Sequence, residues 1–278
     1  IWEAAEKAGK RTILLNYPTT WPNAVKNGIQ VGGGGLGINE YRLRGVEEWT
    51  MKCDVSADIC FTTEDLPEVY KVKVEKADRW ENLPEGVDFK ECELKIRFRW
   101  SDYISKENPW YALLINTGDG YNKVGIYREK DGACPVALVE KGQWSEKIYM
   151  EVETDKGKKK VVFRIKVIDI SSDGEKIKIY FTPLCSLSGF AFPQVIEQEL
   201  ESLDGLPLPS TETISYRLGW IDLNTLSQLI DFQNIYYGEC ARYLLKNKEL
   251  DLFFMHAHCP DHFYHILINE IENDKKVE

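Results

Sequence analysis

The sequence lacks any apolar run of the length that crosses a membrane, and its seven cysteines include no CxxC pair. The opening residues, from Ile1 to Lys7, also lack the pattern of a secretory signal. An odd number of cysteines without paired spacing argues against a disulfide framework and favours a reducing compartment. We therefore predict a protein without a membrane span that resides in the cytoplasm.

An excess of basic charge is lacking too. The chain has 35 Lys and Arg against 45 Asp and Glu, for a net charge of -10, which argues against nonspecific binding of nucleic acid. Hydrophobic residues make up 43% and charged residues 29%, close to the averages of soluble domains. The 278 residues suffice for one large or two modest globular domains, and no pattern in them specifies an oligomeric state.

Three stretches of the chain differ in hydrophobic periodicity. Residues 1–44 show a helix, a strand and a Pro-rich loop, the order typical of an α/β sheet. Residues 45–185 carry short alternating runs separated by turn residues, which predict a mostly antiparallel β domain. Residues 186–278 return to helical periodicity. The simplest organisation is an α/β core interrupted by an inserted β domain.

Individual elements follow from the same patterns. We expect a first helix that starts at Ile1 and stops at Gly9, with Ile1, Ala4, Ala5 and Ala8 on one face, and then a buried strand over 12–16. The strands expected in the β domain are 69–74, 94–100, 111–115, 124–127, 136–139, 148–152, 162–168 and 177–181. The last stretch predicts helices over 194–203 and 222–246, then a fully buried strand of a parallel sheet over 250–255. The apolar face of the long helix is expected to contain Leu226, Leu229, Ile230, Ile235, Tyr236, Cys240, Tyr243 and Leu244.

All four histidines of the chain follow that last strand, at His256, His258, His262 and His265. In open α/β sheets, the loop after a strand is where ligands bind. If a helix begins near Pro260, Asp261 and His265 lie one turn apart on one face and can chelate a divalent ion. A carboxylate with an imidazole suits Zn²⁺ or Mn²⁺ better than Ca²⁺ or Mg²⁺. The alternative is that these histidines cap the helix and pack under a loop.

The segment from Asp251 to His265 resembles a strand, loop and helix of the type I phosphodiesterase/nucleotide pyrophosphatase family, within the alkaline phosphatase superfamily. The shared pattern is Asp-x-x-x-His, and residues 1–22 are similar to the helix, strand and Pro-rich loop that follow the nucleophile segment in that family. The resemblance implies an alkaline-phosphatase-like core into which residues 45–185 are inserted. It also implies that Asp261 and His265 are ligands of one of two metal ions.

The activity that the resemblance implies is hydrolysis of a small-molecule phosphate ester with two divalent ions, zinc or manganese. His258, His262 and His256 would contact the phosphate or hydrogen-bond to the metal ligands. The nucleophile would lie before Ile1 and the remaining ligands after Glu278. We therefore interpret the chain as an internal piece of an enzyme, inactive alone, with at most one partial metal site.

Other interpretations use different residues. The stretch from His256 to His262 nearly matches the His-x-His-x-Asp-His motif of metallo-β-lactamase-like hydrolases but has one residue too many. Thr19 and Thr20 are the only early candidates for a nucleophile, and no Asp precedes them nearby. A GxGxxG pattern at Gly32, Gly34 and Gly37 lacks a strong strand before it, so a loop is favoured over a nucleotide site.

The second class of function is binding, with the β insertion as a module that selects a substrate or a partner. Tryptophans could line a sugar or substrate platform on this domain, although packing in the core is their more common use. The tryptophans concerned include Trp100, Trp110 and Trp144.

Overall fold

The computed structural model describes residues 1–18, 20, 23–32, 58–95, 109–154, 157–208, 213–257, 261, 263–265 and 267–268. The chain divides into two compact units. One unit contains Ile1–Met51, Cys185–Thr213 and Leu223–Glu278, and the other contains Lys52–Leu184 and Ile214–Asp222. The expected border between residues 44 and 45 lies outside the described residues. Within the described part of the chain, no helix is both long and apolar enough to span a membrane.

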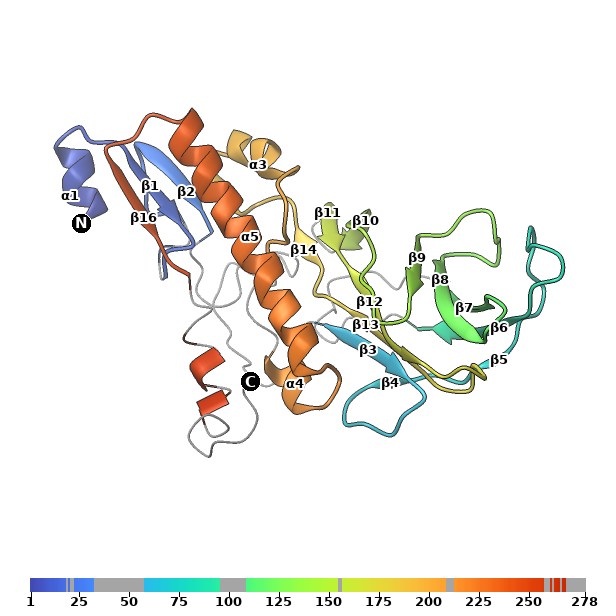
Figure 1. Cartoon of the computed structure of the whole chain (residues 1–278). Coiled ribbons are helices and arrows are strands. Elements are labelled where there is room, and N and C mark those ends of the chain that lie inside the picture. Colours follow the sequence, from blue (N-terminus) through green and yellow to red (C-terminus); the bar gives the residue numbers. More distant parts are fainter. Residues whose placement is uncertain are drawn as a thin grey trace. The chain divides into compact units, whose positions relative to one another are not determined.

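The first unit is built on a mainly parallel sheet with the strand order β15-β2-β1-β16 (Figure 1). Its strands are β1 (Thr12–Leu15), β2 (Gly28–Val31), β15 (Ala191–Phe192) and β16 (Leu252–Met255). Thr12 of β1 is in register with Gly28 on one side and with Leu252 on the other, both in parallel pairs, while β15 runs antiparallel to β2. Strands from the two ends of the sequence therefore share one sheet, as the periodicity of the two flanks predicts.

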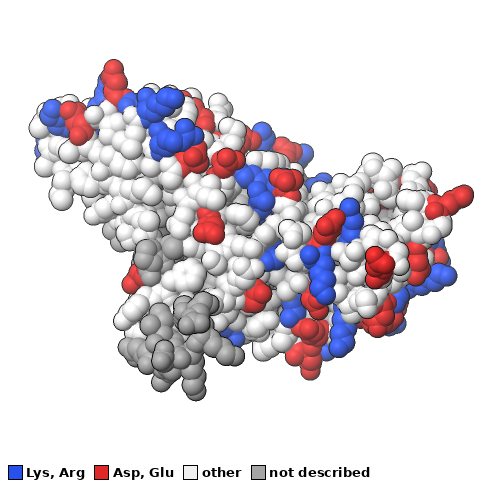
Figure 2. Space-filling model, in the orientation of Figure 1, with Lys and Arg blue, Asp and Glu red and all other residues white. Residues whose placement is uncertain are grey.

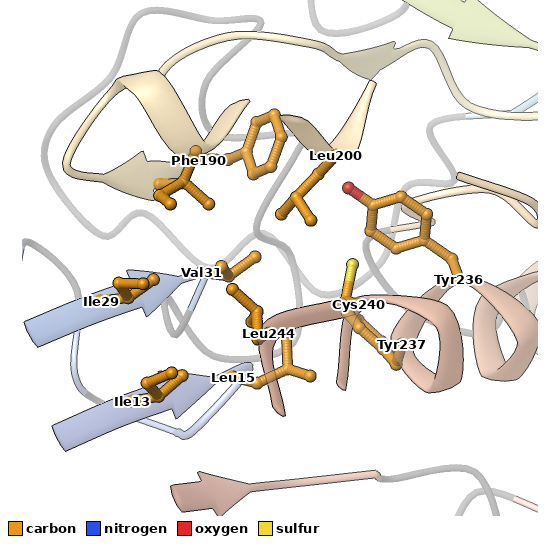
Figure 3. Close-up of a cluster of buried hydrophobic side chains, with 12 residues drawn as sticks. Ile13, Leu15, Ile29, Val31, Phe190, Leu200, Tyr236, Tyr237, Cys240 and Leu244 are labelled. Atoms are coloured by element: carbon orange, nitrogen blue, oxygen red, sulfur yellow. The ribbon is translucent and has the colours of Figure 1, made fainter. Parts of the chain in front are cut away.

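Helix α5 (Leu223–Asn247) packs on one face of this sheet. Figure 3 shows Ile13, Leu15, Ile29 and Val31 of the strands pointing toward Tyr236, Cys240 and Leu244 of α5, with Phe190 and with Leu200 of helix α3 (Val195–Leu200) closing the cluster. The long helix was predicted to within one residue at each end. Its predicted apolar face was wrong at Ile235, which is 46% exposed, and it omitted Tyr237, which is buried.

Several predicted features of the first unit differ from the structure. The stretch before the glycine run is not predicted to be a strong strand, and β2 is indeed short, with four residues, although it lies between two partners within the sheet. Strand β16 was expected to be fully buried, but its first three residues are half-buried and Met255 is exposed, because β1 is the only described strand that pairs with it. Helix α1 (Trp2–Lys7) has no buried residue, so the expected apolar face from Ile1 to Ala8 does not form a core contact. Gly9 ends this helix with a φ of 75°, as predicted.

The second unit is mostly antiparallel, as its alternating pattern predicts. One sheet has the order β12-β13-β3-β4 and another has the order β5-β6-β7-β8-β9. Their strands are β3 (Ile59–Thr62), β4 (Tyr70–Lys71), β5 (Glu75–Lys76), β6 (Phe89–Leu94), β7 (Trp110–Asn116), β8 (Tyr121–Tyr127), β9 (Ala137–Glu140), β12 (Ile165–Ile170) and β13 (Ile177–Phe181). A hairpin joins β10 (Ile148–Thr154) to β11 (Gly157–Phe163), and the parallel pair β3 and β4 is the exception. The remaining described strand, β14 (Cys185–Ser186), belongs to the first unit.

The strand predicted over 162–168 is in fact two strands, β11 and β12, that meet at Arg164. The backbone N–H of Arg164 donates to Oγ1 of Thr182, and its guanidinium donates to the carbonyl of Ser145. The apolar alternation continues through the break, so the arginine is the only local sign of it. The strand predicted over 69–74 shrinks to β4, and β3 was not predicted at all.

The segment 214–222, which was expected to belong to the α/β flank, groups with the β unit. It contains most of helix α4 (Thr213–Arg217). Ser215 donates a hydrogen bond of 2.5 Å to the buried carboxylate of Asp58, which also accepts one from Tyr180. Trp220 is fully buried and its indole N–H donates to the carbonyl of Pro67 at 2.8 Å. These contacts fix the segment to the β unit.

On the face drawn in Figure 2, basic and acidic side chains are interspersed. Several charged side chains of the described residues form ion pairs, such as Lys141 with Asp169 at 2.7 Å and Lys248 with Glu199 at 2.6 Å.

Candidate metal centre

The carboxyl ends of β1, β2 and β16 meet at one edge of the parallel sheet, and Asn16 joins them. The backbone N–H of Asn16 donates to the carbonyl of Val31 at 2.7 Å, and its side-chain amide donates to the carbonyl of His256 at 3.2 Å. The backbone N–H of His256 donates to the carbonyl of Leu15 at 3.2 Å. Asn16 has a φ of 50°, a left-handed conformation that Asn tolerates better than most residues. One residue thus fixes the place where β16 ends.

Gln30 organises the loop beside this edge from within the sheet. Its side chain is fully buried, and its amide donates to the carbonyls of Thr20 at 2.8 Å and Gly32 at 3.0 Å. Its side-chain oxygen accepts from the backbone N–H of Ala24 at 2.8 Å. All these bonds satisfy a buried amide that would otherwise destabilise the sheet. Gln30 therefore holds the loop that follows β1 against the end of β2.

An aromatic cluster fixes the same loop to the outer strand. Trp2 of α1, Tyr17 after β1 and Phe254 of β16 contact one another edge to face, with ring centroids 5.6 to 6.3 Å apart. Such pairs add about 0.5 to 1.5 kcal/mol each beyond the apolar area that they bury. The cluster links α1, β1 and β16.

Asp261 and His265 are both helical, one turn apart, and come after β16 in the sequence. Nε2 of His265 lies 3.3 Å from Oδ1 of Asp261. The Asp261 side chain is 54% exposed and the His265 side chain is 72% exposed, so both donors are open to solvent. The two side chains converge on one point, which is the geometry that the spacing predicts.

The two donor atoms, Oδ1 of Asp261 and Nε2 of His265, and the distance between them fit a divalent ion. Two ligands of a tetrahedral zinc ion, with bonds of about 2.0 to 2.1 Å, lie about 3.3 Å apart. The pair supplies two ligands, and among the described residues no group of three or more His, Cys, Asp or Glu side chains could hold a metal. The same separation also permits an ion pair when His265 is protonated. The pair thus fits half of a metal site, and its role as a ligand set stays a prediction.

The other histidines are placed only in part. His256 is half-buried and is held through its backbone by Leu15 and Asn16. His258 and His262 lie outside the described residues, so their expected contacts with phosphate or with the metal ligands stay predictions, as does the metallo-β-lactamase-like interpretation.

Thr20 and three of the described cysteines are poorly placed for catalysis. Thr20 is 2% exposed and its hydroxyl donates to the carbonyl of Tyr17 at 2.7 Å, while Thr19 lies outside the described residues. Burial raises the pKa of each of the thiols of Cys60, Cys92 and Cys240 to about 12, so these thiols stay protonated at neutral pH.

The remaining motifs have mixed outcomes. Gly32 follows β2 directly with a φ of 66°, whereas Gly34 and Gly37 of the GxGxxG pattern lie outside the described residues. Trp110 is buried, which fits core packing rather than a binding platform, and Trp144 is half-buried beneath the ammonium group of Lys166. Trp100 lies outside the described residues.

Sequence reasoning missed Asn16 and Gln30. The only local signal for Asn16 is a residue tolerant of positive φ directly after a buried strand, and Gln30 interrupts the apolar pattern of β2. Comparison of the chain with protein-family models, with curated proteins and with solved structures finds no match.

Proposed function

We propose that this chain is part of a metal-dependent hydrolase of phosphate esters, similar to phosphodiesterases and nucleotide pyrophosphatases. The observation that carries the proposal is the convergence of Asp261 and His265 at 3.3 Å, in the helix that follows β16. Ligands of α/β sheets characteristically bind beyond the carboxyl ends of parallel strands. A mixed oxygen and nitrogen donor pair favours zinc, with manganese as the alternative.

The residues of this chain have separate parts in the proposed site. Asp261 and His265 hold one ion, which when bound supplies electrostatic stabilisation of a phosphoryl group. Asn16 positions the end of β16, after which the two ligands follow in the sequence. The resemblance assigns the nucleophile to residues before Ile1 and the other metal ligands to residues after Glu278. The substrate is a small phosphate ester, and two divalent ions serve the complete enzyme.

The test uses the natural protein, with any sequence that flanks residues 1–278, purified with zinc. We expect it to hydrolyse bis(p-nitrophenyl) phosphate, and D261N and H265A should each lower metal content and kcat together. A loss of at least about a hundredfold in kcat fits removal of a ligand from a catalytic metal. The matched control is D231N, which removes an exposed helical carboxylate on α5. Unchanged activity and unchanged metal content in both ligand variants would contradict the proposal.

A further inference from the structure

The second unit contains a cleft of about 710 Å³ that shares no residue with the candidate metal centre. Phe61, Val72 and Cys92 give it an apolar lining, and the remaining lining side chains are mostly Lys and Glu. Its volume lies within the range of about 300 to 1,000 Å³ that is common for ligand sites. The cleft is therefore large and open enough to bind a ligand.

An open strand edge faces this cleft. Strand β5 pairs with β6 only at Glu75 with Glu91 and at Lys76 with Lys90. Beyond Glu91, no strand among the described residues pairs with this edge of β6, although β6 continues to Leu94. The lining of the cleft includes Glu91, Cys92 and Glu93 of β6 and the residues just before β5.

Successive residues of β6 point their backbone N–H and C=O groups to opposite sides of the strand. Two hydrogen bonds show which residues point away from β7. The N–H of Asn116 in β7 donates to the carbonyl of Asp88 at 3.1 Å, while on the opposite side the N–H of Ala77 donates to the carbonyl of Phe89 at 3.3 Å. In an antiparallel pair every second residue bonds to the same neighbour, so the backbone groups of Glu91 and Glu93 turn to the side of β5. The N–H and the carbonyl of Glu93 therefore point toward the cleft.

Several of the charged side chains around the cleft are paired. Lys71 forms an ion pair with Asp65 at 2.8 Å, Glu91 pairs with Lys130 at 2.7 Å, and Lys95 lies 3.9 Å from Glu93. The lining contains four Lys and three Glu side chains, so basic charge is in small excess. A complementary ligand carries an acidic group and has backbone hydrogen-bonding groups.

We propose that this cleft binds an extended peptide segment of a partner protein, which adds to the open edge of β6 as a further strand. An acidic side chain of the peptide pairs with Lys95. Main-chain hydrogen bonds to Glu93 supply affinity, and the ion pair with Lys95 fixes the register. The part of β6 that β5 leaves unpaired runs from Cys92 to Leu94, about 10 Å of strand, so a short segment of the peptide covers it. This binding function is independent of phosphate-ester hydrolysis.

The first experiment selects phage-displayed random nonapeptides against the full 278-residue chain and measures synthetic versions of enriched peptides by fluorescence anisotropy. We expect enriched peptides with alternating apolar residues and an acidic residue near one end. The variant K95E should weaken their binding at least about tenfold, and replacing the acidic peptide residue by Lys should restore it. The control E93A keeps the backbone N–H and should change the Kd by less than about threefold.

The second experiment tests the main-chain bonds. E93P removes the N–H that points into the cleft and should abolish binding. Methylating the peptide nitrogen that pairs with Glu93 should have the same effect without any change to the protein, so misfolding of E93P does not obscure the result.

Several results would overturn the proposal. One is the enrichment of no peptide, and another is binding that is insensitive both to N-methylation and to K95E. Self-association of the chain that E93P abolishes would instead assign the edge to a second copy. Binding of oligosaccharides that is lost in Y111A would assign the cleft to sugars.

Discussion

Asn16 is the residue that ties together the ends of β1, β2 and β16. Its left-handed backbone costs an Ala about 1 kcal/mol, and its bond to the carbonyl of His256 contributes about 1 kcal/mol. We expect N16A to lower the free energy of unfolding by about 2 kcal/mol and N16G by about 1 kcal/mol, because glycine keeps the left-handed backbone without strain. Urea denaturation measures both. Equal stability of N16A and the wild type would show that this position is not strained.

Asp251, which lies at the opposite end of the same strands, leads to a prediction about how the free energy of unfolding depends on pH. Its carboxylate accepts from the backbone N–H of Arg11 at 2.9 Å and pairs with Lys10 at 2.9 Å, and these contacts hold its pKa below the ordinary value of 3.8. A depressed pKa in the folded state stabilises the protein above about pH 3.8, and this contribution is lost as the pH falls through the folded value.

We therefore expect D251N to be less stable than the wild type at pH 7, with a difference that shrinks below about pH 3.8 and then disappears. Urea denaturation at a series of pH values measures this difference. A constant difference from pH 7 to pH 2 would mean that the charge of Asp251 does not contribute.

At the scale of single residues, the sequence could predict the pair Asp261 and His265 because a spacing of four on a helix is a local property. It could not predict Asn16 as the link between strand ends, because that role needs the carbonyl of His256, 240 residues away. The buried amide of Gln30 is a similar case, since its partners lie in a loop that no periodicity describes.

Helix α5 is held in place by the packing of one of its faces on the parallel sheet. Leu244 is fully buried against the sheet, whereas the next residue, Leu245, is 53% exposed. We expect L244A to lower the free energy of unfolding by about 2 to 5 kcal/mol and L245A to change it by no more than about 0.5 kcal/mol. Both variants carry the same change in helix propensity, so the difference isolates the packing. Thermal unfolding of the two variants checks this, and equal destabilisation would refute the packing of α5 on the sheet.

Elements with a strong local period were predictable, and those defined by distant partners were not. Helix α5 and strand β13 follow the expected ranges closely because the periodicity and the flanking turns are local signals. Strand β2 has four residues and a glycine at its start, and it becomes a strand because β1 and β15 pair with it. The break between β11 and β12 at Arg164 does not change the hydrophobic periodicity, because apolar residues continue on both sides.

At the scale of the whole chain, the return to helical periodicity after the β region predicts an interrupted α/β core, and the pairing of β1 with β16 agrees with it. The segment 214–222 was assigned wrongly, because its anchors, Ser215 and Trp220, bind to Asp58 and Pro67 of the β unit. The side chains of Ser215 and Trp220 give no local indication of such distant partners. The open edge of β6 likewise becomes visible only when the strands are paired.

Anomalous diffraction at the zinc edge, from crystals of the protein grown with zinc, tests whether Asp261 and His265 bind a metal ion. We expect an anomalous peak within about 2.0 to 2.2 Å of both a carboxylate oxygen of Asp261 and Nε2 of His265. We also expect this peak to disappear in D261N while the fold is retained. Zinc bound elsewhere, with Asp261 and His265 still paired only with each other, would contradict the proposed metal site.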